Sequence, residues 1–303
     1  MTDIDMSVDM CGIQMKNPVT TASGTFGSGR EFSDFVDLNM LGAVTIKGVS
    51  SVPWKGNPAP RIAEVYGGML NSVGLQNPGA DWIIKNDIPF LRQFDTKIIV
   101  NICGHTIEEY CDVAEKISAA DVDMLELNIS CPNVSEGGIA FGTVPKMAEN
   151  VVREVKKHST KPLIVKLSPN VTDITEIAMA AVSGGADGLS LINTLVGMKI
   201  DIKKRQTVLA NKIGGFSGPA VKPVAVRMVY QVCKAVDVPV IGMGGIATSD
   251  DAIEFIMAGA TMVAVGTANF MNPMATENII NGIEGFMREN DISSLSQIRG
   301  IID

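Results

Sequence analysis

Short apolar segments rich in β-branched residues alternate with helix-like segments along almost the whole chain. In the helix-like segment 146-KMAENVVREVKKHS-159, Met147, Val151, Val152 and Val155 fall on one helical face and the charged residues on the other. The apolar segments predict eight strands, at 19–23, 43–47, 98–101, 124–128, 163–167, 188–192, 239–242 and 262–265. Eight successive strand–helix units predict an α/β fold, a (β/α)8 TIM barrel whose parallel strands are buried on both faces.

Three segments do not follow this alternation. Apolar residues occupy every second position from Met6 to Met10 and from Ile13 to Met15, on either side of Cys11-Gly12, which predicts an N-terminal β-hairpin closing the bottom of the barrel. The connections 48–96 and 195–222 are rich in Gly, Pro and Asn and are too long for plain βα loops. Since long loops in a compact domain are usually functional, they are expected to be active-site insertions.

Composition narrows the class of protein. Hydrophobic residues make up 46% of the 303 residues and charged residues 19%, as in a globular protein with a large core. The net charge of −8 argues against a general nucleic-acid binder. The acidic opening MTDIDMSVDM is unlike a secretion signal, and no apolar run approaches the roughly 18–20 residues of a membrane span. Five cysteines, an odd number, indicate reduced thiols rather than a disulfide set, so a cytoplasmic protein is expected. The lack of a C-x-x-C pair argues against an iron–sulfur or zinc site in this chain.

Polar residues end the predicted strands at what would be one rim of the barrel, where barrels of this kind carry their chemistry. In chain order these ends are Ala22-Ser23-Gly24, Lys47-Gly48, Asn101, Asn128 with Ser130 and Cys131, Lys166, Asn193-Thr194, Gly244-Gly245 and Gly266-Thr267. Lysine and asparagine are costly to bury without partners. Polar ends on all eight strands therefore predict one shared ligand.

The last two strand ends are glycine-rich, and each is predicted to open a helix. Backbone N–H groups at a helix N-terminus bind phosphate, and barrels often have such a site after strands 7 and 8. Gly218, in 214-GGFSGPA-220, is expected to add another N–H. The alternative is that these glycines serve only as turns and helix caps.

The segment 242-GMGGIA-247 also matches the fingerprint of a dinucleotide-binding Rossmann fold. That fold requires an acidic residue about 20 positions further on, where this chain has 262-MVAVGT-267, and we therefore reject it.

A thiol lies among the polar residues of 124-MLELNISCPNVSEGG-138. Cys131 follows a strand end, in a loop (132–142) whose glycines are expected to let it close as a lid. A thiol of ordinary pKa, about 8.5, serves as a general base once partly ionised, which makes Cys131 the candidate catalytic residue. Cys11, Cys111 and Cys233 lack such polar neighbours and are interpreted as inert core packing.

The two histidines are weaker candidates for the base. His105 follows the third strand end, but Gly104 and Thr106 on either side favour a helix start there. His158 belongs to a helical segment and is expected to face solvent.

Four segments together resemble dihydroorotate dehydrogenases of class 1, the cytosolic flavin enzymes of pyrimidine synthesis: 128-NISCPN-133, 69-MLNSVGLQNPG-79, 44-VTIKG-48 and 57-NPAPR-61. The resemblance covers nearly the whole chain, including the hairpin and both long connections. In membrane-bound class 2 enzymes a serine stands at the position of Cys131 and a helical extension precedes the barrel, and this sequence has neither. The resemblance implies one FMN-binding TIM-barrel domain over residues 1–303.

The resemblance also implies which residues contact the ligands. The isoalloxazine and ribityl of FMN would lie near Ala22, Ser23, Lys47, Gly48, Asn101, Asn128, Lys166 and Ile192. The phosphate would be held by Gly218, Gly244, Gly245, Gly266 and Thr267. The pyrimidine would contact Lys47, Met69, Asn71, Ser72, Val73, Gly74, Leu75, Asn128, Asn193 and Thr194. A lysine with several amides suits a ligand that has one carboxylate and two imide-like edges.

The implied reaction is the oxidation of dihydroorotate to orotate in de novo pyrimidine (UMP) synthesis. Cys131 would remove a proton from C5 while C6 gives a hydride to flavin N5. Lys166, near the N1/O2 side of the ring, would stabilise the reduced, anionic flavin.

Two segments, 20-TTASGTFGSGREF-32 and 55-KGNPAPRIAEVYGGMLNSVGLQNPG-79, look most like the catalytic subunit of the NAD-linked subclass 1B. In that subclass a homodimer core pairs with a second subunit carrying FAD and a [2Fe–2S] cluster, giving a heterotetramer. The alternative within class 1 is subclass 1A, a homodimer that passes electrons to fumarate.

Three functions outside this family are alternative hypotheses. A tRNA dihydrouridine synthase is another FMN barrel that acts on a pyrimidine, but it should carry a basic RNA-binding surface, which a net charge of −8 disfavours. A sugar-phosphate barrel explains the glycines but not the convergence of Lys47, Asn128 and Cys131. A non-enzymatic binding protein predicts either no flavin or a flavin that no substrate reduces.

Overall fold

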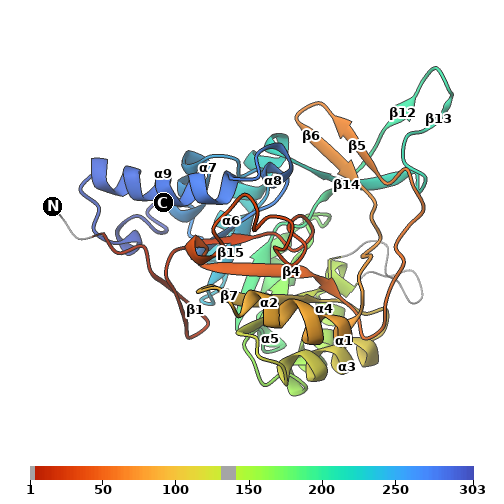
Figure 1. Ribbon diagram of the computed structural model, residues 1–303, viewed down its shortest axis with the longest axis horizontal. Coiled ribbons are helices and arrows are strands. Elements are labelled where there is room, and N and C mark those ends of the chain that lie inside the picture. The colour runs from red at the N-terminus through yellow and green to blue at the C-terminus, as the bar shows by residue number, and fades with distance from the viewer. Residues whose placement is uncertain (1–3, 131–140) are drawn as a thin grey trace.

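Eight parallel strands form the centre of the molecule in the computed structural model, which describes residues 4–130 and 141–303 (Figure 1). In spatial order they are β3 (Val19–Thr21), β16 (Met262–Val265), β15 (Val240–Met243), β10 (Gly188–Leu191), β9 (Leu163–Lys166), β8 (Met124–Asn128), β7 (Lys97–Ile102) and β4 (Ala43–Val49). Around the barrel, these eight strands stand in the same order as in the sequence, and the strands of the inserted segments are not part of it. The predicted eight-stranded (β/α)8 barrel is confirmed, with every strand within two residues of its predicted bounds at each end.

The barrel closes between β3 and β4 through threonine side chains. The Thr45 N–H donates to Oγ1 of Thr21 at 3.0 Å, and the hydroxyls of Thr20 and Thr45 lie 3.1 Å apart. Below them the Gly42 N–H donates to the Val19 carbonyl at 3.1 Å. These bonds satisfy backbone groups that a ladder would otherwise pair, so the buried seam between the first two strands carries no exposed edge.

Helices surround the strands. The longer ones are α3 (Ile107–Ser118), α4 (Pro145–Lys157), α5 (Ile174–Ser183), α6 (Lys222–Ala235), α7 (Ser249–Met257) and α9 (Ala275–Glu289). The shorter ones are η1 (Leu38–Met40), α1 (Ala80–Trp82), η2 (Ile83–Asp87), α2 (Ile88–Leu91), η3 (Phe141–Thr143), η4 (Pro219–Val221), α8 (Ala268–Met271) and η5 (Leu295–Gln297). In α4, Val151, Val152 and Val155 are fully buried, as the sequence predicts. Among the described residues, no helix is long and apolar enough to cross a membrane.

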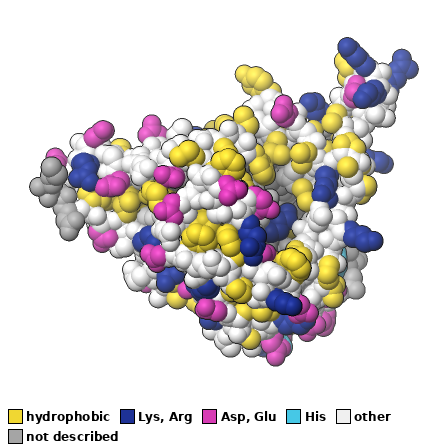
Figure 2. All heavy atoms as spheres, viewed as in Figure 1, with side chains coloured by type: hydrophobic (Ala, Val, Ile, Leu, Met, Phe, Trp, Pro, Cys, Tyr) yellow, Lys and Arg dark blue, Asp and Glu magenta, His cyan; other side chains and the backbone are white. Residues whose placement is uncertain are grey.

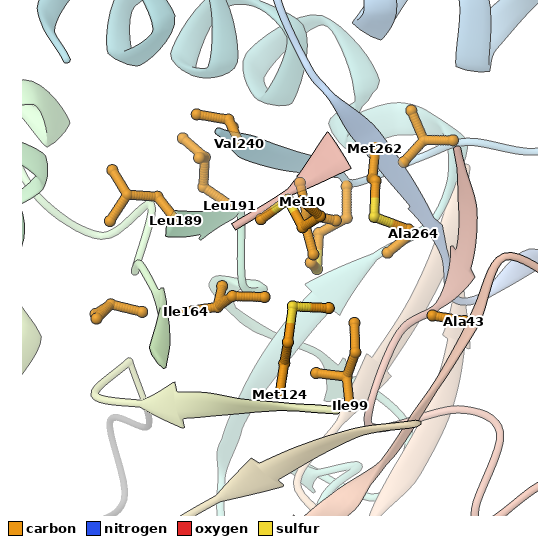
Figure 3. Packing of buried hydrophobic residues seen from close by; sticks show 14 of the residues in the cluster. Met10, Ala43, Ile99, Met124, Ile164, Leu189, Leu191, Val240, Met262 and Ala264 are labelled. Atoms are coloured by element: carbon orange, nitrogen blue, oxygen red, sulfur yellow. The ribbon is translucent and has the colours of Figure 1, made fainter. Parts of the chain in front are cut away.

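The predicted N-terminal hairpin is present as β1 (Val8–Met10) and β2 (Ile13–Met15). Its turn places Cys11 and Gly12 at positive φ, 56° and 81°, which suits a tight two-residue turn. A Cβ added to Gly188, the first residue of β10, would lie 2.7 Å from Sγ of Cys11, so the hairpin lies against the amino-terminal ends of the strands. Met10 lies among Ile99, Met124, Ile164 and Met262, and it closes that end of the barrel with apolar atoms (Figure 3).

The two long connections pair with each other, which the sequence analysis does not predict. They contribute β5 (Ile62–Val65), β6 (Gly68–Asn71), β14 (Ile213–Ser217) and β11 (Leu195–Met198) to one antiparallel sheet, here called the insertion sheet. A short hairpin of β12 (Ile200–Asp201) and β13 (Gln206–Thr207) projects beyond it (Figure 1). Since β11 follows the carboxyl end of β10 closely, the insertion sheet stands at the carboxyl-terminal rim of the barrel.

The insertion sheet and the hairpin beyond it both expose large apolar side chains. Ile200 and Ile202 in the projecting hairpin are 57% and 82% exposed, beside the exposed Lys203, Lys204 and Arg205. Basic side chains gather at the tip of this hairpin (Figure 2). Further exposed apolar residues of the sheet are Ile62, Tyr66, Val196, Met198 and Ile213. Exposed apolar surface of this kind is typical of a protein–protein contact.

Candidate active site

The carboxyl ends of β8 and β10 are joined by side-chain hydrogen bonds. The Asn128 Oδ1 accepts from both the N–H and the hydroxyl of Ser130, at 3.2 and 2.8 Å. The Ser130 Oγ accepts from Nδ2 of Asn193 at 2.5 Å. The Asn193 Oδ1 in turn accepts from the Thr194 N–H at 2.8 Å. The structure thus brings together three of the residues predicted to contact the pyrimidine, Asn128, Asn193 and Thr194.

The insertion sheet adds Asn71 to this group. Gly215 of β14 is opposite Asn71 of β6, and Nδ2 of Asn71 donates to the Gly215 carbonyl at 3.3 Å. A Cβ on Gly215 would lie only 2.0 Å from Oγ1 of Thr194. Gly215 therefore lies between Asn71 and Thr194, and any larger residue would displace Thr194. Met69, also predicted, lies two residues before Asn71 in β6, opposite Ser217.

The loop after β6 carries the other predicted pyrimidine contacts. Ser72 and Val73 bind a neighbouring loop: the Ser72 Oγ accepts from Nδ2 of Asn57 at 3.1 Å, and the Val73 carbonyl accepts from the Asn57 N–H at 3.0 Å. The side chain of Ser72 is thus engaged in shaping the loop. Gly74 and Leu75 both have positive φ, 74° and 53°, which turns the chain back towards β4. A Cβ on Gly48 would lie 3.4 Å from Cδ2 of Leu75, so Leu75 lies against the end of β4.

A charged cluster lies inside the barrel below these amides. Nζ of Lys166 lies 3.9 Å from Oε2 of Glu126 and 3.5 Å from Oγ of Ser23, which lies across the barrel just after β3. The same Glu126 oxygen accepts from Nδ2 of Asn101 at 2.5 Å, and its Oε1 accepts from the Ser190 hydroxyl at 2.7 Å. All five residues are at most 5% exposed. The predicted residues Ser23, Asn101 and Lys166 are therefore neighbours.

Two predicted residues at the end of β4 are placed by an irregularity in the strand. The pairing of β4 with β7 shifts register between Ile46 and Val49, on either side of Lys47 and Gly48. Such a bulge re-aims side chains next to active sites. A Cβ on Gly48 would lie 2.8 Å from Oδ1 of Asn101, so glycine leaves that oxygen accessible. Lys47 is half-buried at this rim.

The glycines predicted to hold a phosphate converge. Gly218, Gly244 and Gly245 all have positive φ, at 117°, 125° and 83°. A Cβ on Gly245 would lie 2.8 Å from the backbone N of Lys222 and 3.0 Å from the Gly218 carbonyl oxygen. A Cβ on Gly244 would lie 3.1 Å from Cγ1 of Ile192, another predicted contact. The three glycines and the start of α6 form one close-packed cradle of backbone.

The end of β16 completes the same side of the rim. The Thr267 hydroxyl donates to Oγ of Ser217 at 2.8 Å, which links β16 to the insertion sheet. A Cβ on Gly266 would lie 3.4 Å from the Cβ of Ala22, so the predicted Ala22 and Gly266 are adjacent. Thr267 directly precedes α8, as predicted for a helix start.

The prediction that Gly244-Gly245 opens a helix is wrong. The next helix, α7, begins only at Ser249, and its first turn is capped by its own residues. Thr248 accepts from the Asp251 N–H at 3.2 Å, and Asp251 accepts from the Thr248 N–H at 2.9 Å. This capping box already binds N–H groups at the start of α7. The helix that lies next to Gly245 is instead α6, through the backbone of its first residue, Lys222.

Cys131, the predicted catalytic residue, and most of the predicted lid lie outside the described residues. The three cysteines interpreted as inert are buried or half-buried. Burial raises the pKa of Cys11 and of Cys233 to about 12 in each case, and it also raises the pKa of Cys111. These thiols stay protonated at neutral pH, which agrees with a packing role.

Neither histidine lies among the polar rim residues. His105 stacks on Trp54 with ring centroids 4.1 Å apart, directly before Thr106, which caps α3. The predicted helix start there is confirmed. His158 ends α4, is exposed, and has Nδ1 3.4 Å from Oε2 of Glu115.

Four polar residues of the site are not among the predicted contacts: Glu126, Ser130, Ser190 and Ser217. Ser130 is predicted only as part of a polar strand end. Glu126 stands third in 124-MLELN-128, a segment whose pattern predicts an apolar strand ending in asparagine. A carboxylate flanked by leucines in a buried strand is itself a signal, because such a charge has to find partners inside the barrel. Ser190 and Ser217 have no comparable local signal.

The fold and the rim define a barrel enzyme whose strand ends carry amides, a buried lysine and a backbone cradle suited to an anion. A family model described as dihydroorotate dehydrogenase matches residues 5–287. The chain is 68% identical, over 99% of both chains, to the protein named dihydroorotate dehydrogenase B (NAD(+)), catalytic subunit, of Alkaliphilus metalliredigens. It is 65% identical to the protein of the same name from Lachnoclostridium phytofermentans, over 99% of this chain and 100% of that one.

The fold has a counterpart among solved structures. The crystal structure of DHODH from Eimeria tenella, in complex with ferulenol, matches with a TM-score of 0.83 at 22% identity, covering 99% of this chain and 89% of that one. The chain belongs to the dihydroorotate dehydrogenase family.

Proposed function

We propose that this chain oxidises dihydroorotate to orotate in de novo pyrimidine (UMP) biosynthesis, as the catalytic subunit of an NAD-linked dihydroorotate dehydrogenase. The observation that carries the proposal is the group of amides at the rim beside a buried lysine: Asn128 and Asn193 both bind Ser130, and Asn71 binds Gly215, which packs against Thr194. The identity of 68% to a relative named as that catalytic subunit supports it.

FMN fits the described residues around the rim. The Asn101 Oδ1 is buried and accepts no hydrogen bond from any described residue, so it is available to a ligand N–H. Lys166 is a buried cation that would stand near the ring. Gly218, Gly244 and Gly245 form a cradle too tight for side chains, which suits the close approach of a phosphate to backbone. When bound, FMN supplies the acceptor for the hydride that leaves C6 of the substrate.

The remaining predicted residues extend this cofactor site. Ala22, Ser23 and Gly266 would border it on the β3–β16 side, and Ile192 would pack against it next to Gly244. Thr267, whose hydroxyl binds Ser217, would stand at the phosphate end. The whole of 1–303 would then be a single FMN-binding barrel domain.

The substrate would bind between the insertion sheet and the ends of β4, β8 and β10. Lys47 would attract the carboxylate, and the amides of Asn71, Asn128 and Asn193 would bind the imide-like edges of the ring. Thr194 would be held in place by Gly215. Met69 and the loop from Ser72 to Leu75 would close the site on the side of the insertion sheet. These contacts fix the ring so that C5 and C6 face the groups that react.

Cys131 would act as the general base. Its thiolate would accept the proton from C5, becoming a thiol, as the hydride leaves C6 and the C5–C6 double bond of orotate forms. A thiol suits this role where polar neighbours keep its pKa near the working pH. Cys11, Cys111 and Cys233, which are buried or half-buried, do not suit it, because burial raises their pKa values.

Electrons would leave through a partner subunit that carries FAD and a [2Fe–2S] cluster, with NAD as final acceptor, in a heterotetramer built on a homodimer of this chain. The name shared by the relatives, catalytic subunit, supports a partner. The exposed apolar side chains of the insertion sheet are of the kind that subunit contacts bury. Reduced cysteines would suit the cytoplasm. A fumarate-linked homodimer is the second candidate.

The test is an anaerobic reduction of the purified chain. L-dihydroorotate should bleach the visible absorbance of the bound FMN, and NAD offered with the partner subunit should restore it. Restoration by fumarate, without any partner, would instead support the homodimeric subclass. A yellow protein that dihydroorotate leaves oxidised would exclude this substrate.

A further inference from the structure

Among the described residues, Glu126 is the most deeply buried acidic side chain, and no step described above uses it. It lies in the middle of β8 and is 2% exposed. Its Oε2 accepts from Nδ2 of Asn101 at 2.5 Å and lies 3.9 Å from Nζ of Lys166. Its Oε1 accepts from the Ser190 hydroxyl at 2.7 Å. The carboxylate therefore contacts groups from β7, β9 and β10.

A buried carboxylate is costly unless charges and hydrogen bonds compensate it, and these partners do so. Each partner is also constrained in return. An ionised carboxylate only accepts hydrogen bonds, so the Asn101 amide has to direct its NH2 group towards Glu126. The Oδ1 of Asn101 then faces Gly48, where it accepts nothing from any described residue. Glu126 thus orients the Asn101 amide so that its Oδ1, a hydrogen-bond acceptor, and not its NH2 group, faces the rim.

Glu126 also balances the charge of Lys166. Besides the carboxylate at 3.9 Å, the described contact of the Lys166 ammonium is the Ser23 hydroxyl at 3.5 Å. The pair carries one positive and one negative charge in a site closed to water, where charges act at long range. The field that this cluster exerts on a ligand above it depends on both members.

We propose that Glu126 is a positioning residue that orients Asn101 and offsets the charge of Lys166, and that it thereby sets the reduction potential of the flavin. This inference rests on the proposed function, because it assumes that FMN binds at the rim above Asn101 and Lys166. Glu126 itself exchanges no proton or electron with the substrate.

The substitution E126Q separates charge from shape. Glutamine can keep both hydrogen bonds, because its Oε1 accepts from Asn101 while its Nε2 donates to Ser190, whose hydroxyl can rotate to accept. The cluster then changes from neutral to a net charge of +1. Reduced FMN is more negative than oxidised FMN, so the variant should favour the reduced form by at least tenfold. This corresponds to a two-electron potential about 30 mV more positive than that of the wild type.

The substitution S190A provides a second test of opposite sign. It removes the hydroxyl dipole from Oε1 of Glu126 but leaves the charge in place. Without this hydroxyl, less of the negative charge of Glu126 is offset by its neighbours, and that charge disfavours the more negative reduced flavin. The reduction potential of the bound FMN should therefore become more negative. T20V serves as the control, since Thr20 is equally buried but its described side-chain hydrogen bond is to the Thr45 hydroxyl in the barrel seam, not to a member of the cluster. Its potential should match that of the wild type even if its stability falls.

The experiment measures the midpoint potential of FMN bound to the full chain, by anaerobic reduction against a reference dye, for the wild type, E126Q, S190A and T20V. A positive shift in E126Q and a negative one in S190A are expected. If E126Q does not fold, S190A decides alone. An unchanged potential in a variant that binds FMN overturns the inference, as does an equal shift in T20V. A wild-type chain that binds no FMN overturns the proposed function and this inference with it.

Discussion

Replacing Gly245 by alanine should weaken the binding of FMN through the backbone cradle. At φ = 83° an L residue costs about 1–2 kcal/mol of conformational strain. In addition, the new Cβ would lie 2.8 Å from the backbone N of Lys222 and 3.0 Å from the Gly218 carbonyl oxygen. Both neighbours are backbone atoms that cannot rotate away, so the cradle has to open.

The size of the effect follows from the contacts that an opened cradle gives up. One hydrogen bond to a charged group is worth about 1.5–3 kcal/mol, so the loss of one phosphate contact should raise the dissociation constant of FMN roughly 10- to 150-fold. The assay is a titration of the apoprotein with FMN, followed by flavin fluorescence.

Gly12 offers a matched control. Its φ of 81° is nearly the same, but a Cβ there would meet no atom within 4 Å, and it lies in the hairpin at the opposite end of the barrel. G12A should therefore lose about 1–2 kcal/mol of folding stability through strain and leave FMN affinity unchanged. Wild-type FMN affinity in G245A, or an equal loss in both variants, would refute the cradle.

Three further predictions concern the chemistry, the substrate contacts and the buried thiols. C131A should keep FMN bound but slow its reduction by dihydroorotate about 10²–10⁴-fold in stopped-flow experiments, and an unchanged rate would remove Cys131 from the mechanism. N193A loses the hydrogen bond to Ser130 and a predicted substrate contact, so kcat/KM should fall about 10- to 100-fold while FMN affinity stays unchanged. If kcat/KM and FMN affinity fall equally, Asn193 supports the fold rather than the substrate. Because burial raises the folded-state pKa of Cys11 and Cys233 to about 12, above the ordinary thiol value of about 8.5, the stability they contribute is present below about pH 8.5 and is lost as the pH rises towards 12. A denaturant midpoint that stays constant over this range, or that falls equally when both are replaced by alanine, would contradict this.

The barrel strands and the N-terminal hairpin could be predicted from the sequence because their signals are local. Buried parallel strands read as short β-branched runs, and the hairpin alternates on either side of Cys11-Gly12. The carboxyl ends of parallel strands meet at one rim, so the polar residues there could be expected to converge. The contacts of Asn128 with Ser130 and Asn193, and of Lys166 with Ser23, agree with that expectation.

The insertion sheet could not be predicted in the same way. Asn71 and Gly215 pair across a separation of 144 residues, and nothing in either segment indicates its partner. The glycines and prolines of both segments favour loops, and tertiary pairing overrides that local preference. The start of α7 is a different case, because 248-TSDD-251 is itself a local capping signal that predicts a helix start at Ser249, whereas the glycines at 244 and 245 lie in a bend before it.

Glu126 illustrates a third limit. Alternation along β8 places Met124, Glu126 and Asn128 on the same side, so the strand carries an apolar, a charged and an amide side chain into the barrel in succession. The apolar run predicts the strand, but it does not predict the buried polar residues, Asn101, Lys166 and Ser190, that Glu126 contacts inside the barrel. Cys131 lies outside the described residues, and its role stays a prediction.

The central claim is that this chain, with its own flavin, converts dihydroorotate to orotate. The most direct measurement is a single anaerobic turnover of the FMN-loaded chain without its partner subunit, with orotate quantified after quenching. We expect about one orotate per bound FMN, formed at the rate at which the flavin absorbance bleaches. Flavin that stays oxidised with dihydroorotate in excess, or bleaching without orotate, would contradict it.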